Sequence, residues 1–247
     1  MSKENKLERV IASLDISPTD FEIARNRYTA VSNWLEGGEY VSGYETDIYL
    51  QGSFRIGTVI RPYRNRQEAD YDIDQVCEII GRETSPRQLK HDVGERLKNN
   101  DDYNRMLDDE GRRCWTLIYA SAEGRPGFHL DVLPSRPANN HTTHINITHK
   151  SQVNYNWRSS NPKGYYQWFK QKNAYSSQFL ESQRKSIYES NKHLYKAMDD
   201  VPKRLVRTPL QRSIQLMKRH RDVYFDGREG CPISIILTTI CAHKYNG

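Results

Sequence analysis

The sequence lacks any run of the ~18 apolar residues that a membrane-spanning helix needs. Its first residues are polar and no apolar segment follows them, so we expect neither a signal peptide nor a membrane partner. Cysteine is also scarce, and no two cysteines have the Cys-x-x-Cys spacing of zinc sites and redox motifs. These absences predict a cytoplasmic protein with reduced, mostly buried thiols, which are Cys77, Cys114, Cys231 and Cys241.

The composition predicts a folded enzyme rather than a disordered chain. Charged residues make up 28% and hydrophobic residues 36% of the 247 residues, which suits a globular protein with a polar cleft. The net charge of +6 favours a polyanionic ligand, either a nucleoside triphosphate or a nucleic acid. This length allows one large domain or two lobes.

Strand patterns fill the first half of the chain and helical patterns the second, which predicts an α+β fold. Ser17 and Pro18 mark the start of a long amphipathic helix that ends before Gly37. No internal repeat or low-complexity tract is present. We expect strands at 46–50, 71–80, 114–120, 128–133 and 143–148, and helices at 18–36, 86–98, 162–171, 174–197, 209–223 and 232–245.

Two short segments carry most of the functional information. Residues 51–58 contain a Gly-Ser turn at Gly52 and Ser53, which can offer backbone N–H groups and a hydroxyl to a triphosphate. The strand that follows carries Asp72 and Asp74, whose side chains point to the same face because they are two positions apart. Paired carboxylates repel each other unless they hold a cation, and Mg²⁺ prefers carboxylate and phosphate oxygens. This layout is typical of a nucleotidyltransferase palm.

A third carboxylate, Asp131, lies within the apolar segment 128–133. A neighbouring strand that brings Asp131 beside Asp72 and Asp74 predicts a two-metal site, in which one ion activates the attacking hydroxyl and the other stabilises the leaving phosphate oxygens. An Asp-x-Asp pair also occurs on solvated strand faces, but the Gly-Ser turn and the third aspartate together favour the metal site.

Asp70 offers an alternative pairing, Asp70 with Asp72. We prefer Asp72 and Asp74 because they directly precede the apolar part of the strand, and because Tyr71 and Ile73 then point together into the core. Asp70 is expected at the solvated start of the strand.

These motifs resemble the cGAS/DncV-like nucleotidyltransferases (CD-NTases). Gly52 and Ser53, followed by Thr58, are similar to the Gly-Ser turn of that family, and the three aspartates are similar to its metal carboxylates. Four later segments also resemble the family, so that the resemblance covers nearly the whole chain. They are residues 160–165 with Trp168 and Phe169, then 208–212, 216–222 and 232–236.

The resemblance implies a mixed-sheet palm over residues 1–155 and a helical lobe over 156–247, with the active site between them. It implies synthesis of a cyclic di- or trinucleotide second messenger from nucleoside triphosphates, ATP or GTP among them, without a nucleic-acid template. The implied cofactor is Mg²⁺, with Mn²⁺ as a substitute. The implied setting is bacterial anti-phage (CBASS) signalling, with regulatory or effector proteins as partners.

The family also contacts the donor triphosphate through a lysine and a serine in the helical lobe, which Lys218 and Ser234 resemble. Lys218 has an alternative interpretation, because Arg219 and Arg221 stand beside it and such a run is usually a solvated basic face. Apolar neighbours in the same helix favour a position toward the cleft, where a lysine can bind phosphate as a point charge.

Two other functions stay open from the residues alone. A template-independent polymerase or tRNA nucleotidyltransferase shares the palm, and an inactive nucleotide-binding regulatory module could keep the same turn. Residues 232–243 are apolar around too much of the helix for a surface helix. We therefore expect the helical lobe to be incomplete at its C-terminus and this helix to be covered by further chain.

Overall fold

The computed structural model describes residues 10–11, 13–122, 126–138 and 142–246. The chain forms two compact units, each built from segments that are distant in sequence. We call Ile23–Phe54 with Asp72–Tyr166 the sheet unit. Arg55–Tyr71 with the described parts of Met1–Glu22 and Gln167–Gly247 is the helical unit. The domain boundary predicted between residues 155 and 156 stays a prediction.

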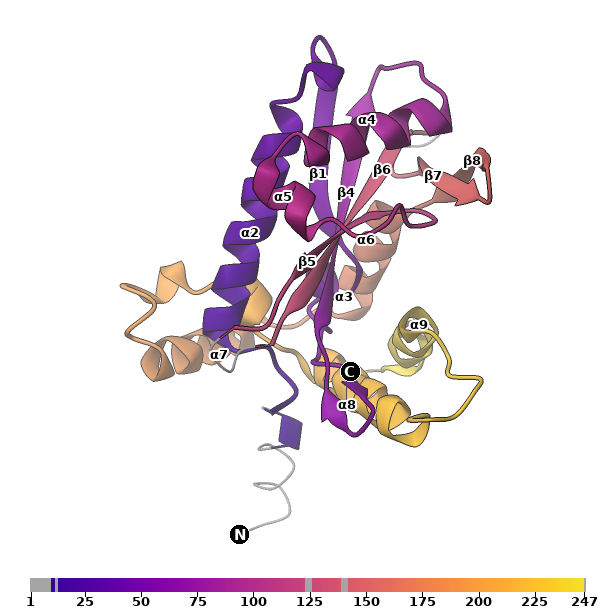
Figure 1. Cartoon of the computed structure of the whole chain (residues 1–247). Coiled ribbons are helices and arrows are strands. Elements are labelled where there is room, and N and C mark those ends of the chain that lie inside the picture. The colour runs from indigo at the N-terminus through magenta and orange to yellow at the C-terminus, as the bar shows by residue number, and fades with distance from the viewer. Residues whose placement is uncertain (1–9, 12, 123–125, 139–141, 247) are drawn as a thin grey trace. The chain divides into compact units, whose positions relative to one another are not determined.

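A six-stranded sheet forms the sheet unit, with the strand order β1-β4-β6-β7-β8 and with β5 paired to β6 (Figure 1). The pairs β1–β4, β5–β6, β6–β7 and β7–β8 are antiparallel. Strands β4 and β6 therefore lie side by side inside the sheet. The bounds are β1 (Glu45–Gln51), β4 (Tyr71–Ile80), β5 (Trp115–Tyr119), β6 (Phe128–Pro137), β7 (Ile145–Ser151) and β8 (Asn154–Ser160).

Helix α4 (Pro86–Lys98) and the Ile23–Glu36 part of α2 (Pro18–Glu36) pack on one face of this sheet. Gln75 of β4 donates from Nε2 to Oγ of Ser32 in α2 over 2.7 Å. Ile79 of the same strand packs with Leu89 of α4. Gln75 and Ile79 are four positions apart and so project from the same side of β4. This side of the sheet is closed by helices, and functional side chains of β4 must lie on the other.

Local sequence explains where α4 begins and how it is fixed to α2. Ser85 caps the helix, because its Oγ accepts the backbone N–H of Gln88 over 3.1 Å and proline follows it at the first helical position. Trp34 donates from Nε1 to the carbonyl of Arg96 over 2.8 Å. Arg96 in turn donates from Nε to the carbonyl of Trp34 over 2.9 Å. The short helices η1 (Glu39–Val41) and α5 (Asp101–Met106) complete this side of the unit.

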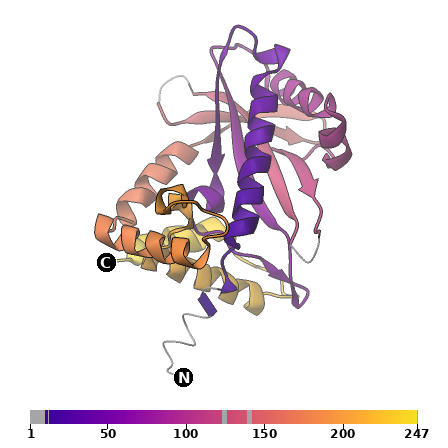
Figure 2. The same cartoon turned by 90° about the vertical axis from the view of Figure 1, so that its left-hand side faces the viewer.

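The helical unit contains a β2–β3 hairpin and helices that follow one another in the second half of the chain (Figure 2). Helix α8 begins with a capping box: Oγ1 of Thr208 accepts the N–H of Gln211 over 3.3 Å, and the N–H of Thr208 donates to Oε1 of Gln211 over 2.8 Å. The bounds are β2 (Tyr63–Arg64), β3 (Gln67–Glu68), α7 (Ser177–Ser190), η2 (Met198–Asp200), η3 (Lys203–Leu205), α8 (Pro209–Tyr224) and α9 (Ser234–Lys244). Helices α3 (Gly52–Ile56) and α6 (Pro162–Lys172) each run from the sheet unit into the helical unit.

The predicted α+β fold class is confirmed, and no helix in the described residues is long and apolar enough to cross a membrane. One predicted helix is too long, because the helix predicted over 174–197 ends at Ser190. Asn191 lies at its end and donates from Nδ2 to the carbonyl of Ile187 over 2.8 Å. Such a side-chain bond to the backbone competes with the hydrogen bonds that would continue the helix. Strand β8, the β2–β3 hairpin and α5 were not predicted.

Helix α9 presents an apolar face to solvent. Ile233, Ile236 and Ile240 share one side of the helix, and they are 64%, 46% and 54% exposed. Contiguous exposed apolar patches mark contacts with other segments or molecules. We therefore predict concentration-dependent self-association of the 247-residue chain, reduced by Ile236→Ser with Ile240→Ser because serine removes the apolar area.

Sedimentation velocity over a range of concentrations measures this prediction. Val153→Ser is the matched control, since Val153 is 80% exposed in the sheet unit and its loss leaves the α9 face intact. Identical sedimentation of the wild-type chain and both variants at every concentration would show that the α9 face has no such role.

Candidate active site

The three predicted aspartates lie on neighbouring strands of the sheet unit. Asp72 and Asp74 are on β4 and Asp131 is on β6, and these strands are adjacent in the sheet order. The predicted adjacency is therefore confirmed. Asp70 precedes β4 and is not part of the strand, so the strand carries the Asp72–Asp74 pair preferred from the sequence.

The aspartates share the face of the sheet that α2 and α4 leave open. Val76 lies two positions after Asp74, Leu133 lies two positions after Asp131, and both apolar side chains belong to one buried cluster. Side chains two apart on a strand project from the same side. Asp74 and Asp131 therefore lie on the same face of the sheet as this apolar cluster, next to its edge.

Asp74 lies directly against the Gly-Ser turn. Its strand neighbour across the β1–β4 pair is Gln51, and Gly52 follows with a φ of +63°. A Cβ on Gly52 would stand 2.1 Å from Oδ2 of Asp74, far inside van der Waals contact. Two separate reasons therefore require glycine at position 52. Its backbone is left-handed, and the Asp74 carboxylate leaves no room for a side chain. Ser53 comes next, partly buried at the start of α3.

Asp131 is held in place by the strand on its other side. Thr116 of β5 stands opposite it in the pairing register, and its Oγ1 donates to Oδ1 of Asp131 over 2.5 Å. Burial raises the pKa of Asp131 above its usual range, the Thr116 hydrogen bond lowers it, and the charge of Asp72 raises it again. Burial is the largest cause of this raised pKa, and the nearby negative charge of Asp72 acts in the same direction.

His129 and Thr116 are members of this site that the sequence analysis missed. His129 lies two positions before Asp131, so it projects from the same face, and its Nδ1 is 3.5 Å from Oδ1 of Asp72. The alternation of His129 and Asp131 along β6 could have indicated the histidine. Thr116 lies opposite Asp131 because of the pairing register of β5 and β6, and no local sequence pattern predicts that register.

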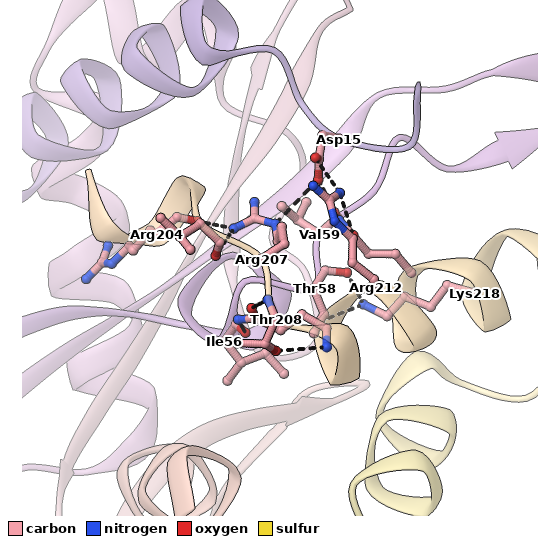
Figure 3. Close-up of polar contacts among 12 residues, drawn as sticks. Asp15, Ile56, Thr58, Val59, Arg204, Arg207, Thr208, Arg212 and Lys218 are labelled. Carbon is pink, nitrogen blue, oxygen red and sulfur yellow. Dashed lines mark hydrogen bonds and ion pairs between the residues drawn. The ribbon is translucent and has the colours of Figure 1, made fainter. Parts of the chain in front are cut away.

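Lys218 and Ser234 belong to the helical unit. Nζ of Lys218 donates to the carbonyl of Thr58 over 2.9 Å and to its Oγ1 over 3.2 Å (Figure 3). Lys218 is only 4% exposed, so its interpretation as part of a solvated basic face is wrong. Oγ of Ser234 accepts from Arg221 over 2.7 Å. Contact of Lys218 and Ser234 with a phosphate stays a prediction.

One side of α8 holds the segment that follows the Gly-Ser turn in the chain. Gln211 donates from Nε2 to the carbonyl of Ile56 over 2.8 Å, and Gln215 donates from Nε2 to the carbonyl of Val59 over 2.9 Å. With Lys218 they occupy positions i, i+4 and i+7 of the helix, which lie on one side. Three buried polar side chains of α8 thus donate hydrogen bonds to backbone carbonyls of the segment 56–59. The sequence did not predict this role for either glutamine.

The donor set suits a hard divalent cation. Its three carboxylates supply only oxygen, which Mg²⁺ and Mn²⁺ prefer, and the missing Cβ of Gly52 leaves room for the Asp74 carboxylate beside the turn. Among the residues that the structure describes, no three His, Cys, Asp or Glu side chains already enclose a metal position. Asp72 is half exposed, and its Oδ1 lies 3.5 Å from Nδ1 of His129.

Comparisons with known proteins show the family of the chain. A family model described as the Second Messenger Oligonucleotide or Dinucleotide Synthetase (SMODS) domain matches residues 1–173. The chain is 32% identical to a c-di-GMP synthase of Roseivirga ehrenbergii, over 99% of this chain and 61% of that protein. It is 27% identical to the cyclic dinucleotide synthase CdnG of Bradyrhizobium diazoefficiens, over 96% of this chain and 58% of that protein. The chain thus spans about three fifths of the length of these curated relatives.

Solved structures show the same fold. The Bradyrhizobium diazoefficiens CD-NTase CdnG in complex with GTP matches with a TM-score of 0.77 and 25% identity, covering 97% of this chain and 70% of that one. The CdnE c-UMP-AMP synthase of Rhodothermus marinus matches with a TM-score of 0.59 and 16% identity over 100% of this chain and 78% of that one, a likeness of fold alone. The chain therefore belongs to the SMODS family of cGAS/DncV-like nucleotidyltransferases.

Proposed function

We propose that the protein is a nucleotidyltransferase that joins two nucleoside triphosphates, GTP first among them, into a cyclic dinucleotide second messenger. The observation that carries this proposal is the close approach of Asp74 to the Gly-Ser turn, where a Cβ added to Gly52 would stand 2.1 Å from Oδ2 of Asp74. The similarity to a c-di-GMP synthase and to a GTP-bound structure supports the choice of GTP. The implied role in anti-phage signalling, with its effector partners, belongs to the same proposal.

Each residue of the site has a distinct task in the proposed reaction. The backbone of Gly52 and the hydroxyl of Ser53 hold the donor triphosphate, because no Cβ keeps the phosphates away from the turn. Asp72, Asp74 and Asp131 would hold Mg²⁺, which when bound supplies positive charge at the phosphates and favours ionisation of the attacking hydroxyl. Thr116 keeps Asp131 oriented through its hydrogen bond.

The chemistry is a phosphoryl transfer in which positioning and charge do most of the work. A ribose hydroxyl of the acceptor attacks the α-phosphorus of the donor, the new P–O bond forms, and the bond to pyrophosphate breaks. The linear dinucleotide keeps one triphosphate, which binds in turn at Gly52 and Ser53. A second attack then closes the ring and releases a second pyrophosphate.

Labelled nucleotides test the proposal. The protein in its full natural length is incubated with Mg²⁺ and each α-labelled nucleoside triphosphate, alone and in mixtures, and the products are treated with phosphatase. We expect a small product that resists phosphatase, because a cyclic product has no terminal phosphate. Long labelled chains would instead indicate a template-independent polymerase, and the absence of any product from a folded protein would indicate a binding module.

A further inference from the structure

The helical unit contains a polar cavity that none of the three aspartates lines. It has a volume of about 480 Å³, within the range of small-molecule sites. Three arginines and a single acidic residue line it, so positive charge is in excess. The charged lining residues are Asp15, Arg61, Arg207 and Arg212.

Arg207 is the most deeply buried of these groups. Its side chain is 2% exposed, and NH1 donates to the backbone carbonyls of Arg204 and Val206. Its Nε is buried without a hydrogen-bond partner, although Oδ1 of Asp15 lies 3.4 Å away as an ion-pair contact. Burying a guanidinium costs free energy when some of its N–H groups lack an acceptor. The unsatisfied Nε of Arg207 therefore indicates a position where a ligand could supply the missing acceptor.

Asp15 is shared and cannot neutralise Arg207 alone. Its Oδ2 pairs with NH1 of Arg212 over 2.5 Å, and its Oδ1 also accepts from Nε2 of Gln215 over 2.8 Å. Figure 3 shows both arginines converging on this one carboxylate. Burial lowers the pKa of Arg207, Asp15 raises it, and the charge of Arg212 lowers it again. A further negative charge would therefore stabilise the cluster.

We propose that this cavity binds a small-molecule oxyanion, a phosphate or carboxylate group, through Arg207 and its arginine neighbours. Arginine is the side chain best suited to such groups, since its planar fork can donate two hydrogen bonds to one anion. Polar residues of α7, Gln183 and Ser186, line the same cavity and can donate to the remainder of the ligand. None of the three aspartates lines this cavity, and the proposal does not depend on the proposed synthesis.

Isothermal titration calorimetry with sodium phosphate and, separately, sodium succinate tests the proposal at constant ionic strength. Wild-type protein should bind at least one of the two saturably, and the anion that binds identifies phosphate or carboxylate as the source. Gln183→Glu places a carboxylate in the cavity without changing the shape of the side chain. We expect it to weaken binding at least about tenfold, because like charges oppose each other.

Gln178→Glu is the matched control. Gln178 is exposed on the same helix and does not line the cavity, so the same change of charge should leave the affinity within about twofold. Arg207→Gln should abolish binding in any preparation that keeps the wild-type circular dichroism. Saturable binding of neither anion to wild-type protein, or equal weakening by Gln183→Glu and Gln178→Glu, would overturn the proposal.

Discussion

Gly52→Ala is expected to lower the kcat/KM for nucleotide transfer by about 100-fold or more, the cost of displacing reacting groups by about 1 Å. The new Cβ would stand 2.1 Å from Oδ2 of Asp74, so either the turn or the carboxylate must move. Both are parts of the proposed site, and the shift would separate the phosphates from the charge that they need. Steady-state kinetics on the full-length protein measure the effect.

Gly43→Ala provides the control for backbone strain. Gly43 also has a positive φ, +80°, but nothing lies within 4 Å of the position of its Cβ. Both variants should lose about 1–2 kcal/mol of stability to the left-handed alanine, and Gly52→Ala should lose more because of its added clash with Asp74, as measured by denaturant unfolding. Only Gly52→Ala should lose activity. Equal kinetics for the two variants would show that Gly52 has a purely structural role.

Asp72→Asn combined with Asp74→Asn is expected to abolish detectable product, a loss of at least about 10³-fold, because charge stabilisation is the largest contribution to such catalysis. Asparagine keeps the shape of each side chain and removes its charge. The fold should survive, because asparagine fits the same space and because the substitution removes the charge of Asp72, which raises the pKa of Asp131. Unfolding free energy should therefore stay equal or increase.

Asp70→Asn is the matched control for this pair, because Asp70 lies just before β4 and the substitution changes one charge in the same segment. We expect Asp70→Asn to keep most of the activity. Loss of activity in Asp70→Asn together with retention in Asp74→Asn would reassign the pair to Asp70 and Asp72. Normal activity in the double variant would remove these carboxylates from the mechanism.

The sequence predicts the parts of this fold that depend on local pattern. Alternation along 71–80 and 128–133 indicates two strands with aspartates on one face, and Ser85 before proline marks the start of α4. The Gly-Ser turn is also local, since a glycine next to a serine is visible in the chain. Each of these features needs only a few neighbouring residues.

Other features depend on contacts between distant segments. Thr116 reaches Asp131 through the register of β5 against β6, and nothing near either residue specifies that register. Gln215 reaches Val59 across 156 positions of sequence. Lys218 resembled a member of a charged surface run, but long-range packing buried it against Thr58. Tertiary packing decided these positions, and local propensity carries no information about it.

The ratio of pyrophosphate to dinucleotide tests the central claim most directly. Mass spectrometry of the product formed from GTP, with pyrophosphate measured in the same reaction, distinguishes ring closure from a single transfer. The proposed reaction forms two phosphodiester bonds per product. It therefore predicts a mass equal to two GMP molecules less two waters, with two pyrophosphates released for each. A product that retains a triphosphate, with one pyrophosphate released for each, would contradict cyclic synthesis by this protein.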